Sequence, residues 1–202
     1  MSDAVFVKIC GLSSVRAVLA TGEAGADAAG FVFADSPRHV SFEQARSLAA
    51  DLPPGVLRVA VFRRVTAEEV DAACDIFEAQ AIQADAASLA RMVLPAGVKA
   101  LPVVRDGDAW SGDSEWILYE SQQSGTGEVA DWAAAAALAR RTRVILAGGL
   151  DVRNVRFALR DVHPWGIDVS SGVEDARGVK NPHKIRAFVA AVRAVEHTAE
   201  GE

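Results

Sequence analysis

Short apolar segments alternate with amphipathic segments along the whole of this 202-residue chain. Eight apolar segments have the length and composition of β-strands. They cover residues 5–10, 28–33, 57–62, 80–84, 98–104, 115–120, 143–147 and 165–171. Several are nearly continuous hydrophobic runs, which is typical of parallel strands covered on both faces.

The segments between the strands predict helices, because apolar residues recur there at helical spacing behind N-cap signals. The expected N-caps are Ser41 and Thr66, each in a capping box, and Asp131, Asp151 and Asn181. Residues 105–114 show no helical period. The helix of the fifth unit is therefore predicted to be short or missing.

Eight strand-then-helix units in a chain of this length predict a (β/α)₈ TIM barrel in the α/β class. Residues 1–202 would form one domain, and the tail from about 195 to 202 is expected to fray. Counting strands does not prove that the sheet closes. A doubly wound open sheet is therefore the alternative.

Charge and composition exclude several classes of partner. The net charge of −6 disfavours nucleic acid and anionic membranes, which need a clustered basic face. The start of the chain has no signal-peptide pattern, and the two cysteines, Cys10 and Cys74, form no CxxC pair. We expect a cytoplasmic protein with no nucleic-acid or membrane partner, as a monomer or alternatively a homodimer.

Two turns with small residues follow the last two predicted strands. They are LAGGLD at 146–151 and DVSSGVED at 168–175. Glycines let backbone N–H groups approach an anion, and serines add hydroxyl donors. Barrels of this class commonly bind phosphate at these two positions. We favour a phosphate site made by Gly149, Ser170, Ser171 and Gly172 over two ordinary turns.

Cys10 and Glu120 end the first and sixth predicted strands, where a barrel has its active site. A thiol near a cation such as Lys8 can act as a base, and a shielded carboxyl group can act as an acid. From position alone, Cys10 can equally be small filler and Glu120 a solvated charge. Cys74, on the apolar stripe of a helix, is expected to be core.

Arg38 and the GTGEVA stretch give weaker signals. Arg38, in the loop after the second strand, could bind a substrate carboxylate or be an ordinary surface arginine. GTGEVA at 125–130 fits a relaxed dinucleotide pattern, but no acidic residue follows at the spacing that a ribose needs. The four histidines share no metal-ligand spacing. We therefore expect neither a nicotinamide cofactor nor a metal.

Five stretches of the chain resemble phosphoribosylanthranilate isomerases of tryptophan biosynthesis. In order, they are KICGLSS, GADAAGFVFADSPRHVS, SGTGEVADW, LAGGLDVRNV and DVSSGVEDARGVKNPHKI. The resemblance runs from the first strand to the last helix and implies a cofactor-free (β/α)₈ barrel. It also implies an Amadori rearrangement of a small phosphosugar, N-(5′-phosphoribosyl)anthranilate, by general acid and base catalysis.

The resemblance gives each matching position a role. Cys10 would be the base and Glu120 the acid, while Arg38 would hold the anthranilate end. Asp168 would face the sugar hydroxyls, with Lys8 also in the substrate site. Gly149, Ser170, Ser171 and Gly172 would hold the phosphate.

The chain departs from the family pattern near the expected acid. Glu120 stands where an aspartate is usual, Asp85 where the family has histidine, and Ala86 where it has glycine. Two alternatives follow. One is a sister isomerase of histidine biosynthesis, or an enzyme for both substrates, although such barrels use an aspartate in place of Cys10. The other is a phosphosugar-binding barrel with weakened catalysis.

Overall fold

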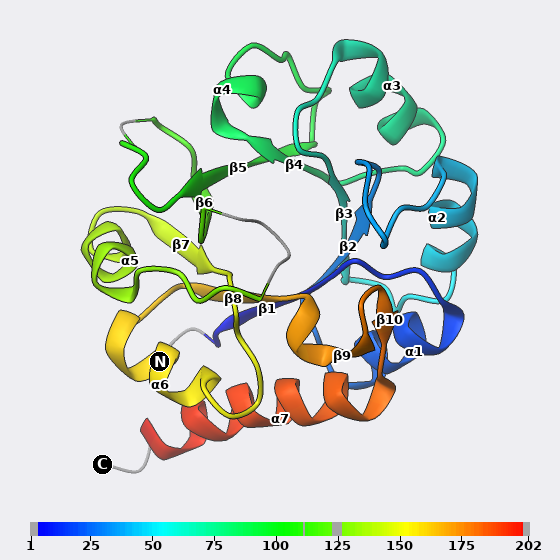
Figure 1. Cartoon of the computed structure of the whole chain (residues 1–202). Helices are drawn as coiled ribbons and strands as arrows, with labels where there is room; N and C mark the ends of the chain where they lie inside the picture. Colours follow the sequence, from blue (N-terminus) through cyan, green and yellow to red (C-terminus); the bar gives the residue numbers. More distant parts are fainter. Residues whose placement is uncertain (1–3, 111, 123–126, 200–202) are drawn as a thin grey trace.

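The computed structural model of the protein describes residues 4–110, 112–122 and 127–199, with side chains up to residue 195. Eight parallel strands close into a barrel in the order β1 to β8, and β1 pairs with β8 (Figure 1). They are β1 (Phe6–Cys10), β2 (Ala28–Val32), β3 (Leu57–Val61), β4 (Ala81–Asp85), β5 (Lys99–Arg105), β6 (Trp116–Glu120), β7 (Arg143–Leu146) and β8 (Gly166–Val169). Closure confirms the predicted barrel and excludes the open sheet.

The helices lie outside the ring of strands (Figure 1). They are α1 (Val15–Glu23), α2 (Phe42–Ala49), α3 (Ala67–Asp75), α4 (Ala86–Leu89), α5 (Trp132–Ala139), α6 (Val155–Val162) and α7 (Pro182–Ala199). None of the described residues between β5 and β6 is helical, as predicted for the fifth unit. Helix α7 extends into the segment that was expected to fray.

Most of the predicted N-caps are observed. Ser41 and Thr66 form reciprocal capping boxes with Gln44 and Glu69 at the starts of α2 and α3. Asp131 accepts two backbone N–H bonds at the start of α5. The Asn181 side chain accepts two at the start of α7.

Asp151 is the exception, because it caps a turn and not a helix. Its Oδ1 accepts from the amides of Arg153 and Asn154, and α6 begins only at Val155. The side chain of Asn154 is turned back and donates to Gly149 O at 2.8 Å. The prediction that Asp151 caps this helix was therefore wrong, and the turn that it closes belongs to the glycine pair after β7.

Two hydrophobic clusters build the core. The larger lies between the sheet and the helices, and Cys74 packs against it partly buried. The smaller fills the inside of the barrel with residues from alternate strand positions, including Ala28, Leu101 and Ile145. The inside is therefore a packed core and not a pore.

Aromatic rings fill the N-terminal end of the barrel interior. Phe6 stacks on Trp165 with ring centroids 4.8 Å apart, and Trp116 meets both rings edge-on. Lys99 and Arg143 lie over the two tryptophan rings. Because this end is filled by apolar rings, the polar side chains inside the barrel are concentrated toward the opposite end.

Candidate active site

The predicted site residues lie at, or one layer below, the C-terminal end of the barrel. Cys10 and Glu120 are the last residues of β1 and β6. Lys8 and Asp168 lie in β1 and β8 and are directly paired in the ladder. The strand expected over 165–171 ends at Val169, so Ser170 and Ser171 belong to the turn that follows.

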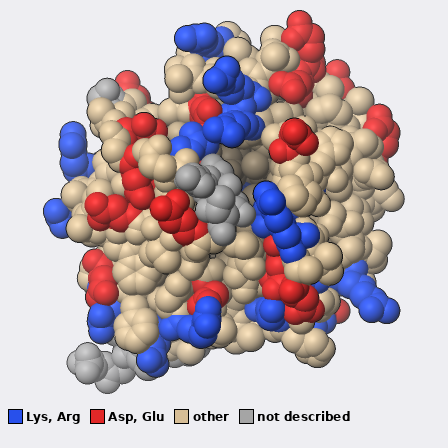
Figure 2. Space-filling model, in the orientation of Figure 1, with Lys and Arg blue, Asp and Glu red and all other residues tan. Residues whose placement is uncertain are grey.

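One pocket brings most of these residues together. It is lined by Glu120, Asp168, Gly149, Ser170 and Ser171, with Gly127 and Glu128 from the loop after β6. Figure 2 shows this face of the molecule hollowed beside the grey residues, with basic and acidic side chains around the hollow. The GTGEVA stretch lies partly outside the described residues, which resume at Gly127.

A buried ion pair lies beneath the pocket. The Nζ of Lys8 donates to Asp168 Oδ1 at 2.7 Å, and Lys8 is fully buried. Burial alone would lower the pKa of Lys8, but the charges and hydrogen bonds of Asp168 and Cys10 together outweigh burial, and the pKa is raised. Lys8 therefore carries its positive charge inside the barrel.

Cys10 lies on the same side of β1 as Lys8 and is 7% exposed. Burial raises the pKa of the Cys10 thiol, and the positive charge of Lys8 opposes that rise without cancelling it. The sequence led us to consider a lowered thiol pKa. The structure gives the opposite direction, because desolvation of the thiolate outweighs the nearby cation.

Arg38 is held by a buried carboxylate. Its Nε and Nη2 donate to the two oxygens of Glu174 at 2.7 and 2.9 Å. The same carboxylate accepts from Lys180 Nζ at 2.6 Å. Burial alone would raise the pKa of Glu174, but the hydrogen bonds from Arg38 and Lys180 lower it to about 2. Arg38 is thus buried, and not an ordinary surface arginine.

Gly11, the glycine of the KICG motif, lets the Arg38 side chain approach the end of β1, the strand that carries Cys10. Gly11 has a φ of +78°, and an added Cβ would lie 2.5 Å from the Arg38 side chain. The same Cβ would lie 3.3 Å from Ser170 Oγ. Only glycine fits this left-handed, crowded position without strain. Gly11 therefore allows the ends of β1 and β8 and the Arg38 loop to converge.

The two predicted phosphate turns are packed against each other. A Cβ on Gly172 would lie 1.9 Å from Leu150 O, so the backbones touch where the turns meet. Lys180 Nζ donates to Ser170 O at 2.9 Å and to Ser170 Oγ at 3.2 Å. Glycine at 172 and lysine at 180 thus fix the shape of the turn after β8.

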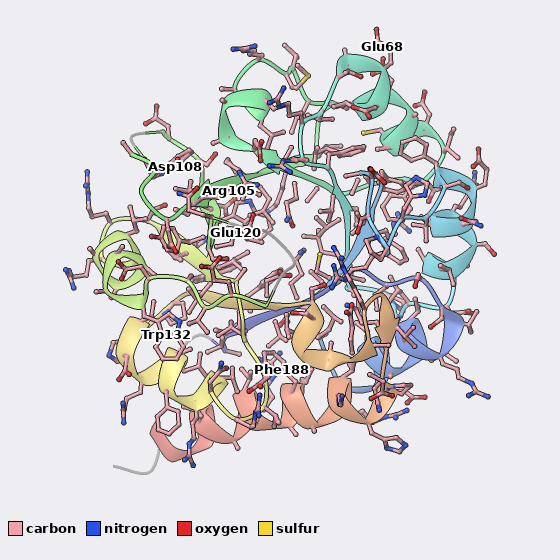
Figure 3. All side chains as sticks on the ribbon, viewed as in Figure 1. Glu68, Arg105, Asp108, Glu120, Trp132 and Phe188 are labelled. Carbon is pink, nitrogen blue, oxygen red and sulfur yellow. The ribbon has the colours of Figure 1, made fainter. Side chains whose placement is uncertain are left out.

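A third ionic group lies on the β4–β6 side of the mouth. Arg105 Nη1 lies 2.7 Å from Asp85 Oδ1, and its Nη2 lies 3.2 Å from Glu120 Oε1. Figure 3 shows Arg105 and Glu120 beside each other at the inner edge of the ring. The arginine therefore links the two acidic residues that depart from the family pattern.

Sequence reasoning missed three residues of this arrangement. Glu174 and Lys180 lie within DVSSGVEDARGVKNPHKI, one of the stretches that resemble the family, but no local pattern links them to Arg38. Arg105 was missed because the fifth strand was expected to end at 104, one residue before the end that the structure gives. A strand boundary one residue later would have placed Arg105 at the mouth.

The described part of the chain contains no group of three or more His, Cys, Asp or Glu side chains that could hold a metal. None of its helices is both long and apolar enough to cross a bilayer.

The fold and the site together define a class. A closed parallel barrel with glycine and serine turns after its last two strands, and with ionisable groups at the same mouth, has the architecture of barrel enzymes that act on small phosphorylated substrates. The profile of the N-(5′-phosphoribosyl)anthranilate isomerase family matches residues 7–191. The chain belongs to this family.

Individual relatives match this chain over nearly its full length. The isomerase of Pseudomonas fluorescens is 40% identical, and the match covers 95% of this chain and all of that protein. The crystal structure of the Thermus thermophilus enzyme is 31% identical with a TM-score of 0.83, covering 95% of this chain and 100% of that one.

Two further structures bear on ligand and assembly. A phosphoribosyl anthranilate isomerase in complex with reduced 1-(o-carboxyphenylamino)-1-deoxyribulose 5-phosphate is 30% identical, with a TM-score of 0.76 and coverage of 94% and 99%. The crystal structure of mutually generated monomers of the dimeric Thermotoga maritima enzyme is 28% identical with a TM-score of 0.78 and the same coverage.

Proposed function

We propose that this chain catalyses the Amadori rearrangement of N-(5′-phosphoribosyl)anthranilate to 1-(2-carboxyphenylamino)-1-deoxyribulose 5-phosphate, in tryptophan biosynthesis. One observation carries the proposal: this chain belongs to the isomerase family, and its pocket is lined by predicted site residues. These residues are Glu120, Asp168, Gly149, Ser170 and Ser171.

The first chemical step is opening of the ribose ring. Glu120 donates its proton to the ring oxygen, the bond from that oxygen to C1′ breaks, and the anilino nitrogen supplies electrons to form a protonated Schiff base. A carboxyl group does this only while it carries a proton, which partial shielding from water favours. The Glu120 side chain is 13% exposed, but Arg105 Nη2 lies 3.2 Å from its Oε1, and that cation favours the ionised form.

The second step is loss of the C2′ proton. The Cys10 thiolate accepts it, the electron pair moves toward the Schiff-base nitrogen, and the resulting enol-amine tautomerises to the ketone. The positive charge of Lys8 favours the thiolate form against the effect of burial. The substrate gains one proton from Glu120 and loses one to Cys10, and C1′ is reduced as C2′ is oxidised within the same molecule, so no redox partner is needed. The thiol then loses a proton to solvent and the carboxylate regains one before the next turnover.

The remaining residues bind and orient the substrate. Arg38 donates two of its five N–H groups to the Glu174 carboxylate. Its guanidinium group therefore retains N–H donors that can bind the anthranilate carboxylate. Asp168 lines the pocket, and we assign it the role of accepting a hydrogen bond from a sugar hydroxyl. The amides and hydroxyls of the turns after β7 and β8, with Gly149, Ser170, Ser171 and Gly172, would bind the phosphate.

The decisive experiment is a turnover assay with purified protein. Addition of N-(5′-phosphoribosyl)anthranilate should give an enzyme-dependent loss of anthranilate-type fluorescence. Cys10→Ala should abolish kcat and leave binding of the reduced product analogue nearly intact. Cys74→Ala is the matched control, because it removes the other thiol from a helix outside the barrel, and it should keep wild-type turnover.

Other outcomes would redirect the assignment. Binding of the reduced product analogue without turnover would identify a phosphosugar-binding barrel with weakened catalysis. Turnover of the histidine-pathway aminoaldose that survives Cys10→Ala would identify the sister isomerase. We further infer a cytoplasmic monomer. Light scattering at micromolar concentration would reveal a homodimer if this inference is wrong.

A further inference from the structure

Asp85, Arg105 and Glu120 form a chain of charges on three consecutive strands at the barrel mouth. Arg105 and Glu120 are direct partners in the β5–β6 ladder, and Asp85 pairs with Val103, two residues before Arg105. Side chains alternate along a strand, so Arg105 points to the same side as Leu101 and Val103, which fill the barrel interior. All three charged groups therefore meet above the packed core.

We propose that Arg105 is a positioning residue that holds the Glu120 carboxyl group for ring opening, with Asp85 fixing Arg105 from the opposite side. The inference rests on the proposed function, since it assigns a task to the residue that supports the acid. It concerns residues to which the family resemblance gives no such role.

One guanidinium group reaches both carboxyl groups. Its Nη1 lies within ion-pair distance of Asp85 and its Nη2 within ion-pair distance of Glu120, although Asp85 Oδ1 accepts no hydrogen bond from the described residues. The contact with Asp85 is therefore electrostatic, and the width of the planar group lets it span the two carboxyl groups. The side chains of Arg105, Asp85 and Glu120 are 16%, 24% and 13% exposed. Such partly shielded contacts restrict side chains more than pairs in open solvent do.

Glutamate at position 120 makes such support useful. It has one more rotatable bond than aspartate, so its carboxyl group samples more positions unless a partner restricts it. A misplacement of about 1 Å in a reacting group can cost on the order of 100-fold in rate. The contact with Arg105 limits that freedom.

Asp85 also balances charge. A cation beside Glu120 favours the ionised carboxylate, which cannot donate a proton. Asp85 contributes a negative charge to the same arginine and so reduces that effect. The other charged side chains that line the pocket with Glu120 are Glu128 and Asp168, and Asp168 is already paired with Lys8.

The test compares Arg105→Met, Arg105→Lys and Asp85→Asn with the wild type. Arg105→Met should lower kcat by about 10- to 100-fold and change KM by less than about threefold. Arg105→Lys should give an intermediate kcat, because an ammonium group restores the charge but not the width of the planar group. In a Glu120→Gln background, Arg105→Met should cause no further loss.

Arg143→Met is the matched control. Arg143 is also a strand arginine in an ion pair, at 2.8 Å from Glu115, but β7 begins with it at the far end of the barrel. This variant should keep wild-type kcat. Wild-type kcat in Arg105→Met, or equal losses in the two methionine variants, would overturn the inference and leave the proposed reaction standing.

A second readout does not depend on turnover. The ¹³C signal of the Glu120 carboxyl group, identified by its loss in Glu120→Gln, should titrate at higher pH in Arg105→Met, because the cation is gone. It should titrate at lower pH in Asp85→Asn, because the balancing anion is gone. Unchanged midpoints in both variants would refute the inference. A wild type without turnover would refute the proposed function and, with it, the task in ring opening, while the titration would still show whether Arg105 and Asp85 act on Glu120.

Discussion

The Nζ of Lys8 lies 2.7 Å from Asp168 Oδ1, and this buried ion pair joins the first strand of the barrel to the last. The two side chains are 0% and 8% exposed. If one of them is removed, water therefore cannot solvate the charge that remains. The pair therefore supports barrel closure as well as the site above it.

Lys8→Met should destabilise the protein strongly, because it leaves the Asp168 charge buried without its partner. The expected loss is about 3–5 kcal/mol, measured by urea unfolding at pH 7. Arg186→Met is the control. It breaks a pair with Glu23 whose side chains are 45% and 58% exposed, so it should cost at most about 1 kcal/mol. Similar losses in the two variants would contradict the structural assignment.

Glu174→Gln should weaken both substrate binding and folding. It removes the carboxylate that pairs with Arg38 and Lys180 and leaves two nearly buried cations together. We expect a loss of about 3–5 kcal/mol in unfolding free energy. KM should rise more than kcat falls, since Arg38 is assigned to binding. A kcat effect with unchanged KM would argue against that role for Arg38.

The same carboxylate predicts how stability responds to acid. The pKa of Glu174 is lowered from 4.5 to about 2 in the folded protein. Its contribution is therefore complete above about pH 5 and is lost as the pH falls toward 2. Urea unfolding at intervals from pH 6 to pH 2.5 should show the stability gap between wild type and Glu174→Gln narrowing with acidity. A difference in stability that stays constant with pH would show that the Glu174 carboxylate does not cause the loss of stability in acid.

Much of the fold could be predicted because the signals are local. A parallel strand buried on both faces leaves a continuous apolar run, and a capping box such as that of Ser41 lies within four residues. Asp151 shows the limit of such signals. The same side chain can cap a helix or close a turn, and here it closes a turn in which the side chain of Asn154 reaches back to Gly149.

The site was only partly predictable, because its partners are distant in sequence. Arg38 and Glu174 are 136 positions apart, and no period or motif states that they pair. The direction of the Cys10 pKa likewise depends on how completely the barrel buries the thiol, which the sequence does not show. Strand ends, by contrast, gave the positions of Cys10 and Glu120 directly, because barrel topology brings all eight ends to one mouth.

The raised pKa of Cys10 predicts when its thiolate forms. Burial raises the pKa of the thiol above its ordinary value of 9.0, so only a small fraction of the free enzyme carries the thiolate at pH 7. The kcat/KM does not report this group alone, because the reaction also needs Glu120 in its protonated form. The rate at which a thiol-alkylating reagent modifies Cys10, measured in a Cys74→Ala background between pH 6 and 9.5, should therefore rise with pH up to at least pH 9. Lys8→Arg should keep this profile, provided that it folds, since the charge opposing the shift is retained. An alkylation rate that is already constant below pH 7 would mean that Cys10 is ionised in the free enzyme and that the charge of Lys8 outweighs burial.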